Sequence, residues 1–283
     1  MKNNVVALIV SYNGGEDLKN TVVALVAQVQ KILILDNNSN VETKKIIFEL
    51  ISKFGVSFIE FDSNMGIGFA LNKGLEIAKK ENFDWILTMD QDSVASSNMI
   101  SEMLASSAKF SGMKIICPLL LLSGLEFSPK DDHLVIYAIT SGNLVPIEVF
   151  SKIGGFNEDY FIDSVDFEFS LRARNNGIGI VQCGRASLIH RLGELDCVKI
   201  FSINYCYTRH SPLRRYYIVR NHFYLISEFW HKNPIFLAKK SIALMRQVIE
   251  ILLFDDKRVE NFKMMSLGFC DFVRGRGGRF QNV

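Results

Sequence analysis

Short apolar runs alternate with longer amphipathic segments through the first third of the chain. The runs are mostly apolar, as in strands that are buried on both faces, and they cover residues 5–10, 32–35, 56–61 and 85–89. The segments between them repeat apolar residues every three or four positions, as helices do, and they cover residues 18–29, 46–54 and 69–80. One helix between successive strands makes βαβ units, so the sequence predicts an α/β fold with a mainly parallel central sheet.

Polar residues follow directly after three of these runs. Ser11, Asp36 and Asp90 each come immediately after, or at, the point where the apolar run ends. The carboxyl ends of parallel strands meet at one edge of a sheet, and ligands of such sheets bind there. We therefore expect these three side chains to share one site.

The remaining elements are predicted from the same periodicities. Further strands are expected at residues 114–122, 134–139, 178–181 and 187–189, and a helix at residues 97–110. Another helix begins near Asp163 or Ser164, either of which can cap it, and ends at residues 176–177. Two helices at residues 213–230 and 235–254 form a helical hairpin. The predicted division is a catalytic domain of residues 1–200 and a basic helical extension of residues 201–283 packed on it.

Charge is distributed unevenly between the two ends of the chain. Residues 1–184 hold 15 Lys and Arg against 22 Asp and Glu, whereas residues 185–283 hold 17 against 8. A basic rear part suits an anionic surface. The two rear helices either pack on the first domain or also lie at a membrane interface, with their Lys and Arg near phospholipid headgroups.

The five cysteines contain no CxxC pair. An odd count without metal-ligand spacing indicates reduced, mostly buried thiols in a cytosolic protein. The apolar run at residues 5–10 is shorter than the core of an export signal. No apolar run approaches the roughly 18 to 20 residues that span a bilayer. The expected location is the cytoplasm, with peripheral contact at the inner face of the membrane.

Two carboxylates follow the strand at residues 85–89. Asp90-Gln91-Asp92 places both in one short loop, where they can meet a divalent cation, because Mg²⁺ and Mn²⁺ prefer hard oxygen ligands. His190 follows another apolar run and, as neutral imidazole, can complete the same metal site. Either the residues form such a site or they are a solvated loop and a structural histidine.

The stretch DSVDFEFSLR at residues 163–172 is the candidate for acid–base chemistry. Asp166 lies in the predicted first turn of a helix, where it is either a general base or a simple complement to the helix dipole. Glu168 faces away from Asp166, and Arg172 lies four residues further on. We expect Glu168 and Arg172 to form a salt bridge.

Two other segments contain residues that suit phosphate binding. Gly66 and Gly68 precede a helix and allow its backbone to approach a phosphate. The dinucleotide fingerprint GxGxxG fails because Leu71 occupies its last position, which excludes a nicotinamide or flavin enzyme. The segment at residues 210–221 interleaves basic and aromatic residues, either for a phosphate or as a basic helix face. No nucleic-acid-binding motif accompanies it.

Together these segments resemble the family 2 glycosyltransferases, which have the GT-A fold. The resemblance covers most of the chain and rests on VSYN at residues 10–13, DNNS at 36–39, NMG at 64–66, DQDS at 90–93, GGF at 154–156 and residues 161–172. DQDS, FIDSVDFEFSLR, HSPLRRYYIVRN and the closing GRGGR at residues 275–279 are similar to the rhamnosyltransferase branch.

The resemblance implies a nucleotide-diphospho-sugar donor, a divalent cation and a general base. Donor contacts are implied for Ser11, Tyr12, Asn13, Asp36, Asn38, Asn64, Gly66, Asn72, Asp90, Gln91 and Asp92. Asp90, Asp92 and His190 would hold Mg²⁺ or Mn²⁺, and Asp166 would be the base. Contacts to the acceptor or the diphosphate are implied for Asp163, Glu168, Arg191, Arg214, Arg215 and Tyr216.

The implied activity is inverting transfer of one sugar, L-rhamnose from dTDP-L-rhamnose, to a glycan or lipid-linked acceptor in surface polysaccharide synthesis such as O-antigen or capsule. The QxxRW motif of processive synthases is absent, which favours single transfer, and Phe169 stands where many relatives have Trp. Alternatives are a UDP-sugar donor, a nucleotidyltransferase, and a non-catalytic glycan-binding scaffold. The chain is not expected to bind nucleic acid, and a homo-oligomer is compatible with the sequence.

Overall fold

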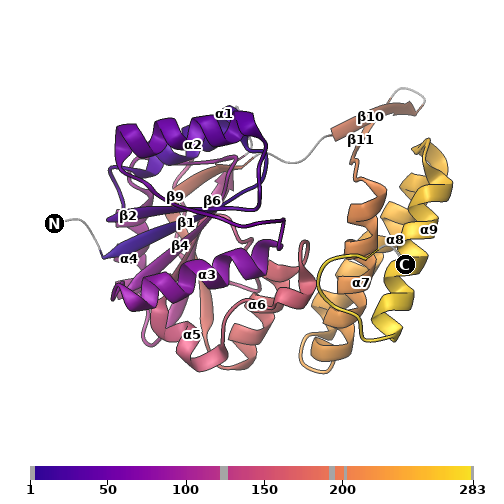
Figure 1. Cartoon of the computed structure of the whole chain (residues 1–283). Coiled ribbons are helices and arrows are strands. Elements are labelled where there is room, and N and C mark those ends of the chain that lie inside the picture. Colours follow the sequence, from indigo (N-terminus) through magenta and orange to yellow (C-terminus); the bar gives the residue numbers. More distant parts are fainter. Residues whose placement is uncertain (1–3, 122–126, 191–194, 201–202, 282–283) are drawn as a thin grey trace.

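A computed structural model describes residues 4–121, 127–190, 195–200 and 203–281. Its first part is a layered α/β domain, and three long helices stand beside this domain (Figure 1). The main strands are β1 (Val5–Ser11), β2 (Lys31–Asp36), β3 (Ser57–Glu60), β4 (Trp85–Asp90), β5 (Ser93–Ala95), β6 (Lys114–Leu121), β7 (His133–Val135), β8 (Asn143–Pro146) and β9 (Gly179–His190). The helices of this domain are α1 (Gly15–Leu25), α2 (Val41–Phe54), α3 (Ile67–Lys80), α4 (Met99–Lys109), α5 (Ile147–Ile153) and α6 (Val165–Asn175), with the short 3-10 helix η1 (Glu158–Tyr160).

The central sheet has the order β3-β2-β1-β4-β8-β6-β9-β5, with β7 also paired to β9. Strands β3, β2, β1 and β4 run parallel, and β8 joins β4 in the antiparallel sense. The parallel half confirms the βαβ pattern. It brings the carboxyl ends of β1, β2 and β4 to one edge, where Ser11 pairs in register with Asp36 and Val10 with Asp90.

Both faces of the sheet are covered by apolar helix faces. Leu18 of α1, Leu50 of α2 and Met103 of α4 belong to the core on one face. Leu71 of α3, Phe150 of α5 and Phe169 of α6 belong to the core on the other. The helices form because their apolar residues recur at helical spacing, and burial of these faces supplies most of their stability.

The middle and rear of the chain differ from the sequence prediction in several elements. Strand β8 and helix α5 were not predicted, and one long strand, β9 (Gly179–His190), replaces the two strands predicted at residues 178–181 and 187–189. The strand expected at residues 134–139 is limited to β7. Ser164 precedes α6 with φ of 65° and its side chain makes no capping hydrogen bond, so the predicted cap is wrong.

The rear part contains more than the expected helical hairpin. Three helices, α7 (Pro212–Phe229), α8 (Pro234–Phe254) and α9 (Arg258–Val273), pack together, and α7 contacts both others. A β-hairpin of β10 (Leu195–Ile200) and β11 (Ile203–Thr208) precedes them, and Figure 1 shows it standing apart from the central sheet. The predicted domain boundary after residue 200 falls between the two strands of this hairpin.

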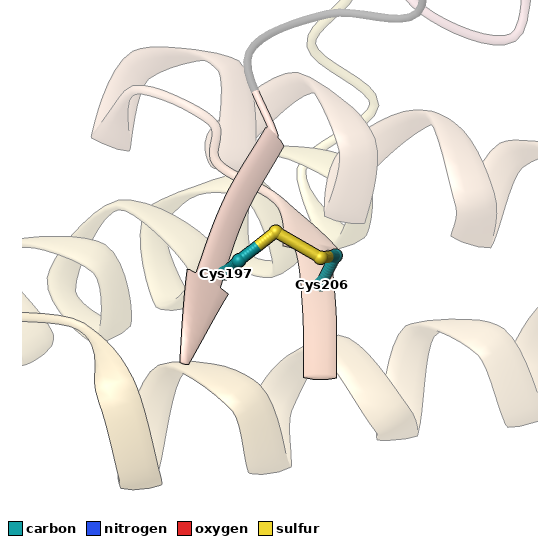
Figure 2. The surroundings of a disulfide bond; sticks show 2 residues. All are labelled: Cys197 and Cys206. Atoms are coloured by element: carbon teal, nitrogen blue, oxygen red, sulfur yellow. A yellow bond between two sulfur atoms is a disulfide. The ribbon is translucent and has the colours of Figure 1, made fainter. Parts of the chain in front are cut away.

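The hairpin carries a disulfide bond. Cys197 and Cys206 are directly opposite in the antiparallel register, and their sulfur atoms are bonded (Figure 2). The expectation of reduced thiols is therefore wrong for this pair. Facing positions on paired strands bring two cysteines within bonding reach, although nine residues separate them in the sequence. Cys117 and Cys183 are free and buried, as expected, whereas Cys270 is free and exposed.

The GRGGR segment returns from α9 to the catalytic domain (Figure 1). Gly278 donates its backbone N–H to the Asp159 carbonyl at 2.7 Å and accepts a hydrogen bond from Arg220 of α7, also at 2.7 Å. A Cβ atom on Gly277 would lie 2.5 Å from the Asp159 side chain, so only glycine allows this approach. We call residues 275–280 the tail strap.

None of the helices described is both long and apolar enough to cross a membrane.

Candidate active site

A cavity of about 530 Å³ opens at the carboxyl ends of β1 and β4. Side chains from both strand ends, from the loop before α3, from α6 and β9 and from α7 line it. Ten residues expected in the site line this cavity: Tyr12, Asn64, Gly66, Asp90, Gln91, Asp92, Asp163, Asp166, His190 and Arg214. The structure thus brings together residues up to about 200 positions apart in sequence, as expected for a site at this edge of the sheet.

The loop after β4 and the end of β9 form a potential cation site. One ligand atom from each of Asp90, Asp92 and His190 lies within 4.8 Å of the other two. Burial, with a smaller contribution from the neighbouring Asp92 carboxylate, raises the pKa of Asp90 from 3.8 to about 7. A divalent cation would offset the repulsion between the two carboxylates, and the oxygen and nitrogen donors suit Mg²⁺ or Mn²⁺.

Two buried serines orient His190, and the sequence prediction missed both. Ser93 Oγ lies 2.9 Å from His190 Nδ1, and the Ser141 hydroxyl donates to Ser93 Oγ at 2.8 Å. The same Nδ1 lies 4.0 Å from Asp92 Oδ1, so the serines hold the edge of the imidazole that lies beside the carboxylates. The antiparallel register of β5 and β9 places Ser93 opposite His190. Sequence spacing alone cannot show that register.

Gln91 holds the two strand-end loops together. Its Oε1 accepts the Tyr12 backbone N–H at 2.8 Å, and its Nε2 donates to the Tyr12 carbonyl at 3.1 Å. This pair of hydrogen bonds fixes the loop that carries Asp90 and Asp92 against the end of β1. The Gln91 side chain therefore acts on the site by bonding the Tyr12 backbone, whereas Asp90 and Asp92 present their carboxylates to the cavity.

Asp166 lies in the first turn of α6 and faces the same cavity. Its Oδ1 accepts the Phe167 backbone N–H at 2.8 Å. Burial raises the pKa of Asp166 from 3.8 to about 6, although this hydrogen bond and the Lys240 cation lower it. A carboxylate with a pKa near 6 is ionised at neutral pH and is a stronger base than an ordinary aspartate, as general-base catalysis requires.

The loop before α6 is strained, and α7 holds it in place. Phe161, Asp163 and Ser164 all have positive φ, which is rare for residues other than glycine. Asn221 of α7 donates its side-chain amide to the carbonyls of Tyr160, Ile162 and Asp163 at 2.8–2.9 Å. These bonds fix the backbone that leads directly into Asp166.

In the basic segment at residues 210–221, Arg214 lines the cavity. Its guanidinium donates to Asp163 at 3.0–3.2 Å, which ties the start of α7 to the loop before α6. Its charge also lowers the pKa of Asp90. A cation at this place suits an anionic ligand in the cavity.

Five residues expected to contact the donor do not line the cavity. The Asp36 carboxylate is buried and accepts the Ser39 N–H and hydroxyl, so it shapes the turn before α2. The Ser11 side chain is likewise fully buried. Strand ends share an edge, but their side chains point to different sides, so Ser11 and Asp36 do not join Asp90 in the cavity. The side chains of the other three residues form hydrogen bonds with the backbone of neighbouring segments, and these residues are Asn13, Asn38 and Asn72.

Gly66 and Gly68 both pack closely against the segment before α6. Gly66 has φ of 89°, and a Cβ atom there would lie 2.7 Å from the Phe161 carbonyl oxygen. A Cβ atom on Gly68 would lie 2.9 Å from the Asn157 carbonyl oxygen. The glycines therefore let the start of α3 lie against the segment before α6. Asn37, which was not predicted, holds the same loop by accepting the Met65 N–H at 3.0 Å.

Three residues expected to contact the acceptor are buried elsewhere. Glu168 pairs with Arg172 at 2.6 Å, which confirms the predicted salt bridge and directs this carboxylate away from the cavity. Arg215 donates to Gln247 of α8, and Tyr216 donates to Asp271 of α9 at 2.8 Å. The basic segment therefore faces mainly the interior of the three-helix bundle. Arg191 lies outside the described residues.

The mainly parallel sheet carries the Asp90–Asp92–His190 cluster at its strand ends, with Asp166 in the same cavity, and its fold is the GT-A fold of nucleotide-diphospho-sugar transferases. Residues 6–131 match the family model Glycosyl transferase family 2. The chain is 29% identical to the dTDP-rhamnosyl transferase RfbF of Shigella flexneri, and the alignment covers 99% of both chains. Residues 6–131 are thus a family 2 glycosyltransferase domain, in a chain that is similar over its whole length to a rhamnosyltransferase.

Solved structures agree on the fold. An S. aureus TarS fragment in complex with UDP-GlcNAc superposes with a TM-score of 0.64 at 16% identity, covering 98% of this chain and 82% of that one. GalNAc-T7 with UDP, GalNAc and Mn²⁺ superposes with a TM-score of 0.63 at 13% identity, covering 95% of this chain and 56% of that one.

Proposed function

We propose that this enzyme transfers L-rhamnose from dTDP-L-rhamnose, with inversion, to a glycan or lipid-linked saccharide in bacterial surface polysaccharide synthesis. The observation that carries the proposal is the single cavity shared by the Asp90–Asp92–His190 cluster and the Asp166 base. The full-length similarity to a dTDP-rhamnosyl transferase supports the choice of donor.

The reaction requires one base and a neutralised leaving group. Asp166 takes the proton from the acceptor hydroxyl, whose oxygen then attacks the anomeric carbon while the bond to the diphosphate breaks. Attack on the face opposite the leaving group inverts the anomeric carbon without a covalent enzyme intermediate. Mg²⁺ or Mn²⁺, held by Asp90, Asp92 and His190, would neutralise the leaving diphosphate. Tyr12 and Asn64 line the part of the cavity near the end of β1, where we place the nucleoside.

Thermal stabilisation by candidate donors tests this function. A ligand that binds the folded state raises the melting temperature by mass action. We expect dTDP-L-rhamnose to stabilise the protein in Mg²⁺ or Mn²⁺ and this shift to disappear in EDTA. In Asp92→Ala the metal-dependent part of the shift should be lost.

The same panel separates the alternatives. A shift with UDP-galactofuranose, UDP-glucose or UDP-galactose alone would keep the enzyme class and remove rhamnose. A shift that EDTA leaves intact would argue against the metal site. No shift with any donor, together with no release of dTDP or UDP over hours, would favour a glycan-binding scaffold.

The surface of α8 and α9 suits the proposed contact with the cytoplasmic face of the membrane. Its exposed apolar side chains include Ile242, Met245, Ile249, Leu252, Val259, Phe269 and Val273. An apolar groove of about 380 Å³ runs between the two helices. Exposed Lys239, Lys257 and Lys263 lie on the same two helices or between them. Apolar side chains among cations are typical of helices that bind anionic lipid surfaces.

Flotation with phospholipid vesicles tests this contact. We expect the protein to float with vesicles containing phosphatidylglycerol and not with phosphatidylcholine alone. The double change Ile242→Glu and Ile249→Glu should abolish flotation, whereas Val23→Glu, at an exposed apolar residue of α1, should not. Loss of a dimer in the double variant, with no flotation of the wild type, would instead assign this face to a homo-oligomer.

A further inference from the structure

A second cavity, of about 210 Å³, adjoins the active site between α6, α7 and α8. It shares Asp163, Ser164, Phe167 and Arg214 with the active-site cavity. We call it the side cavity. A ligand that extends from one cavity to the other passes the start of α6, where Asp166 lies.

The side cavity contains more cationic than anionic groups. Its described lining includes Arg214, Lys240, His210 and His222, and its carboxylate is Asp163. The Asp163 carboxylate is already bonded to Arg214 through three contacts of 3.0–3.2 Å. Among the residues that the structure describes, no carboxylate forms an ion pair with Lys240 within 4.0 Å, although the charges of Lys240 and Asp166 each act on the pKa of the other.

Aromatic rings hold the Lys240 ammonium group at this place. Its Nζ lies 3.5 Å from the Phe167 ring centroid, 5.1 Å from that of Tyr137 and 5.6 Å from that of Phe236. Ring faces attract a cation and partly replace its water. Burial lowers the pKa of Lys240, and the nearby Asp166 carboxylate raises it. The rings orient the ammonium group without neutralising its charge, which leaves its donors for a ligand.

Burial, and to a smaller extent the neighbouring cations, lower the pKa of both imidazoles of the side cavity. Burial, with smaller contributions from Arg214 and Arg215, lowers the pKa of His210 to about 4. Burial also lowers the pKa of His222, with a further contribution from Lys240. Both side chains are neutral at pH 7 and are hydrogen-bonding groups beside the cations.

We propose that the side cavity binds an oxyanion of the acceptor, with Lys240 as its main cationic contact. The group is either the phosphate of a lipid-linked saccharide or the carboxylate of an acidic sugar, because both present oxygen atoms to an ammonium group and neutral imidazoles. An oxyanion held there places the adjoining part of the acceptor beside Asp166. The assignment of the ligand to an acceptor rests on the proposed function, whereas oxyanion binding in the side cavity does not.

Ligand-observed NMR on the full chain tests the binding. Phenyl phosphate and benzoate are titrated in parallel, once with saturating dTDP and Mg²⁺ to fill the donor site, and once in EDTA alone. Loss of one charge-assisted contact weakens binding about tenfold or more, so we expect Lys240→Met to lose that much affinity. Lys240→Arg keeps the charge and should remain within about threefold of the wild type.

Lys239→Met is the matched control, because Lys239 is the exposed neighbour on the same helix. It should bind both probes as the wild type does. Tighter binding of phenyl phosphate assigns a phosphate-bearing acceptor, and tighter binding of benzoate assigns an acidic sugar. Equal affinity of the wild type and Lys240→Met for both probes, with both proteins folded by thermal melting, would overturn the proposal.

The titrations with dTDP and Mg²⁺ and in EDTA distinguish a wrong donor from a wrong assignment of the side cavity. If dTDP does not bind but the EDTA titration still depends on Lys240, the proposed donor is wrong and the side cavity stands. If dTDP binds with Mg²⁺ and neither probe depends on Lys240, the side cavity is wrong and the donor stands.

Discussion

Asp166 is the residue on which the proposed chemistry depends most directly. Removing its basicity while keeping its shape leaves the donor contacts and the α6 backbone in place. We expect Asp166→Asn to lower turnover by at least about 100-fold, since general-base catalysis contributes about 10² to 10⁴. Donor affinity by thermal shift should stay within a few-fold of the wild type. Turnover at the wild-type level would exclude Asp166 as the base.

The pKa of the same carboxyl predicts the pH dependence. Because the pKa of Asp166 is raised to about 6, the base is protonated below that pH, and turnover should fall about tenfold for each pH unit below it. Lys240 lowers this pKa, so Lys240→Met should move the acid limb of the turnover profile to higher pH. The limb should not move in Lys239→Met. A limb at the same pH in all three proteins would contradict the assignment.

How far the sequence predicts the site differs from residue to residue. Asp90, Asp92 and His190 converge as expected, because strand ends and a long paired strand fix where their backbone lies. Ser11 and Asp36 lie at the same edge but pair with each other, whereas Asp90 pairs with Val10, so their side chains are on the opposite face of the sheet from Asp90. Local chain pattern carries no information about that pairing.

At the scale of elements, α7 supports the loop before α6, which leads into Asp166. Asn221→Ala removes three hydrogen bonds to the backbone before α6. Buried carbonyls left without donors cost free energy, so we expect the free energy of unfolding to fall by about 2 kcal/mol and the turnover number to fall with it. Asn176→Ala, at an exposed residue that bonds the Arg172 carbonyl, is the matched control. Denaturant unfolding and initial rates measure both effects.

Some elements can be predicted from the sequence because their hydrophobic pattern extends over enough residues to be recognised. Helices α1 to α4 and strands β1 to β4 repeat their pattern over several turns or fill a buried run, so they were predicted. Strand β8 has four residues and runs directly into α5, so no turn separates these two elements in the sequence. The hairpin of β10 and β11 lies where the sequence prediction places no element, because the predicted rear helices begin at residue 213 and the last predicted strand ends at residue 189.

At the scale of the whole molecule, the tail strap joins the helical bundle to the catalytic domain. Gly277→Val places side-chain atoms where the Asp159 side chain lies, so the strap must move away. We expect a lower melting temperature, because the Gly278 and Phe280 contacts to Asp159, Arg220 and Tyr217 are lost together. Gln281→Val, at an exposed neighbour, should melt as the wild type does. An unchanged melting temperature in Gly277→Val would show that the strap adds no stability.

The tail strap also sets the order in which the enzyme becomes complete during translation. Domains fold from the N-terminus as the chain leaves the ribosome, so the sheet with Asp90 and Asp92 can form early. Arg220, which also bonds the Asp159 carbonyl, receives its Gly278 partner only after more than fifty further residues have emerged. A nascent chain that ends at α9 would hold both carboxylates of the cation site but an unsecured support for the loop that carries the base.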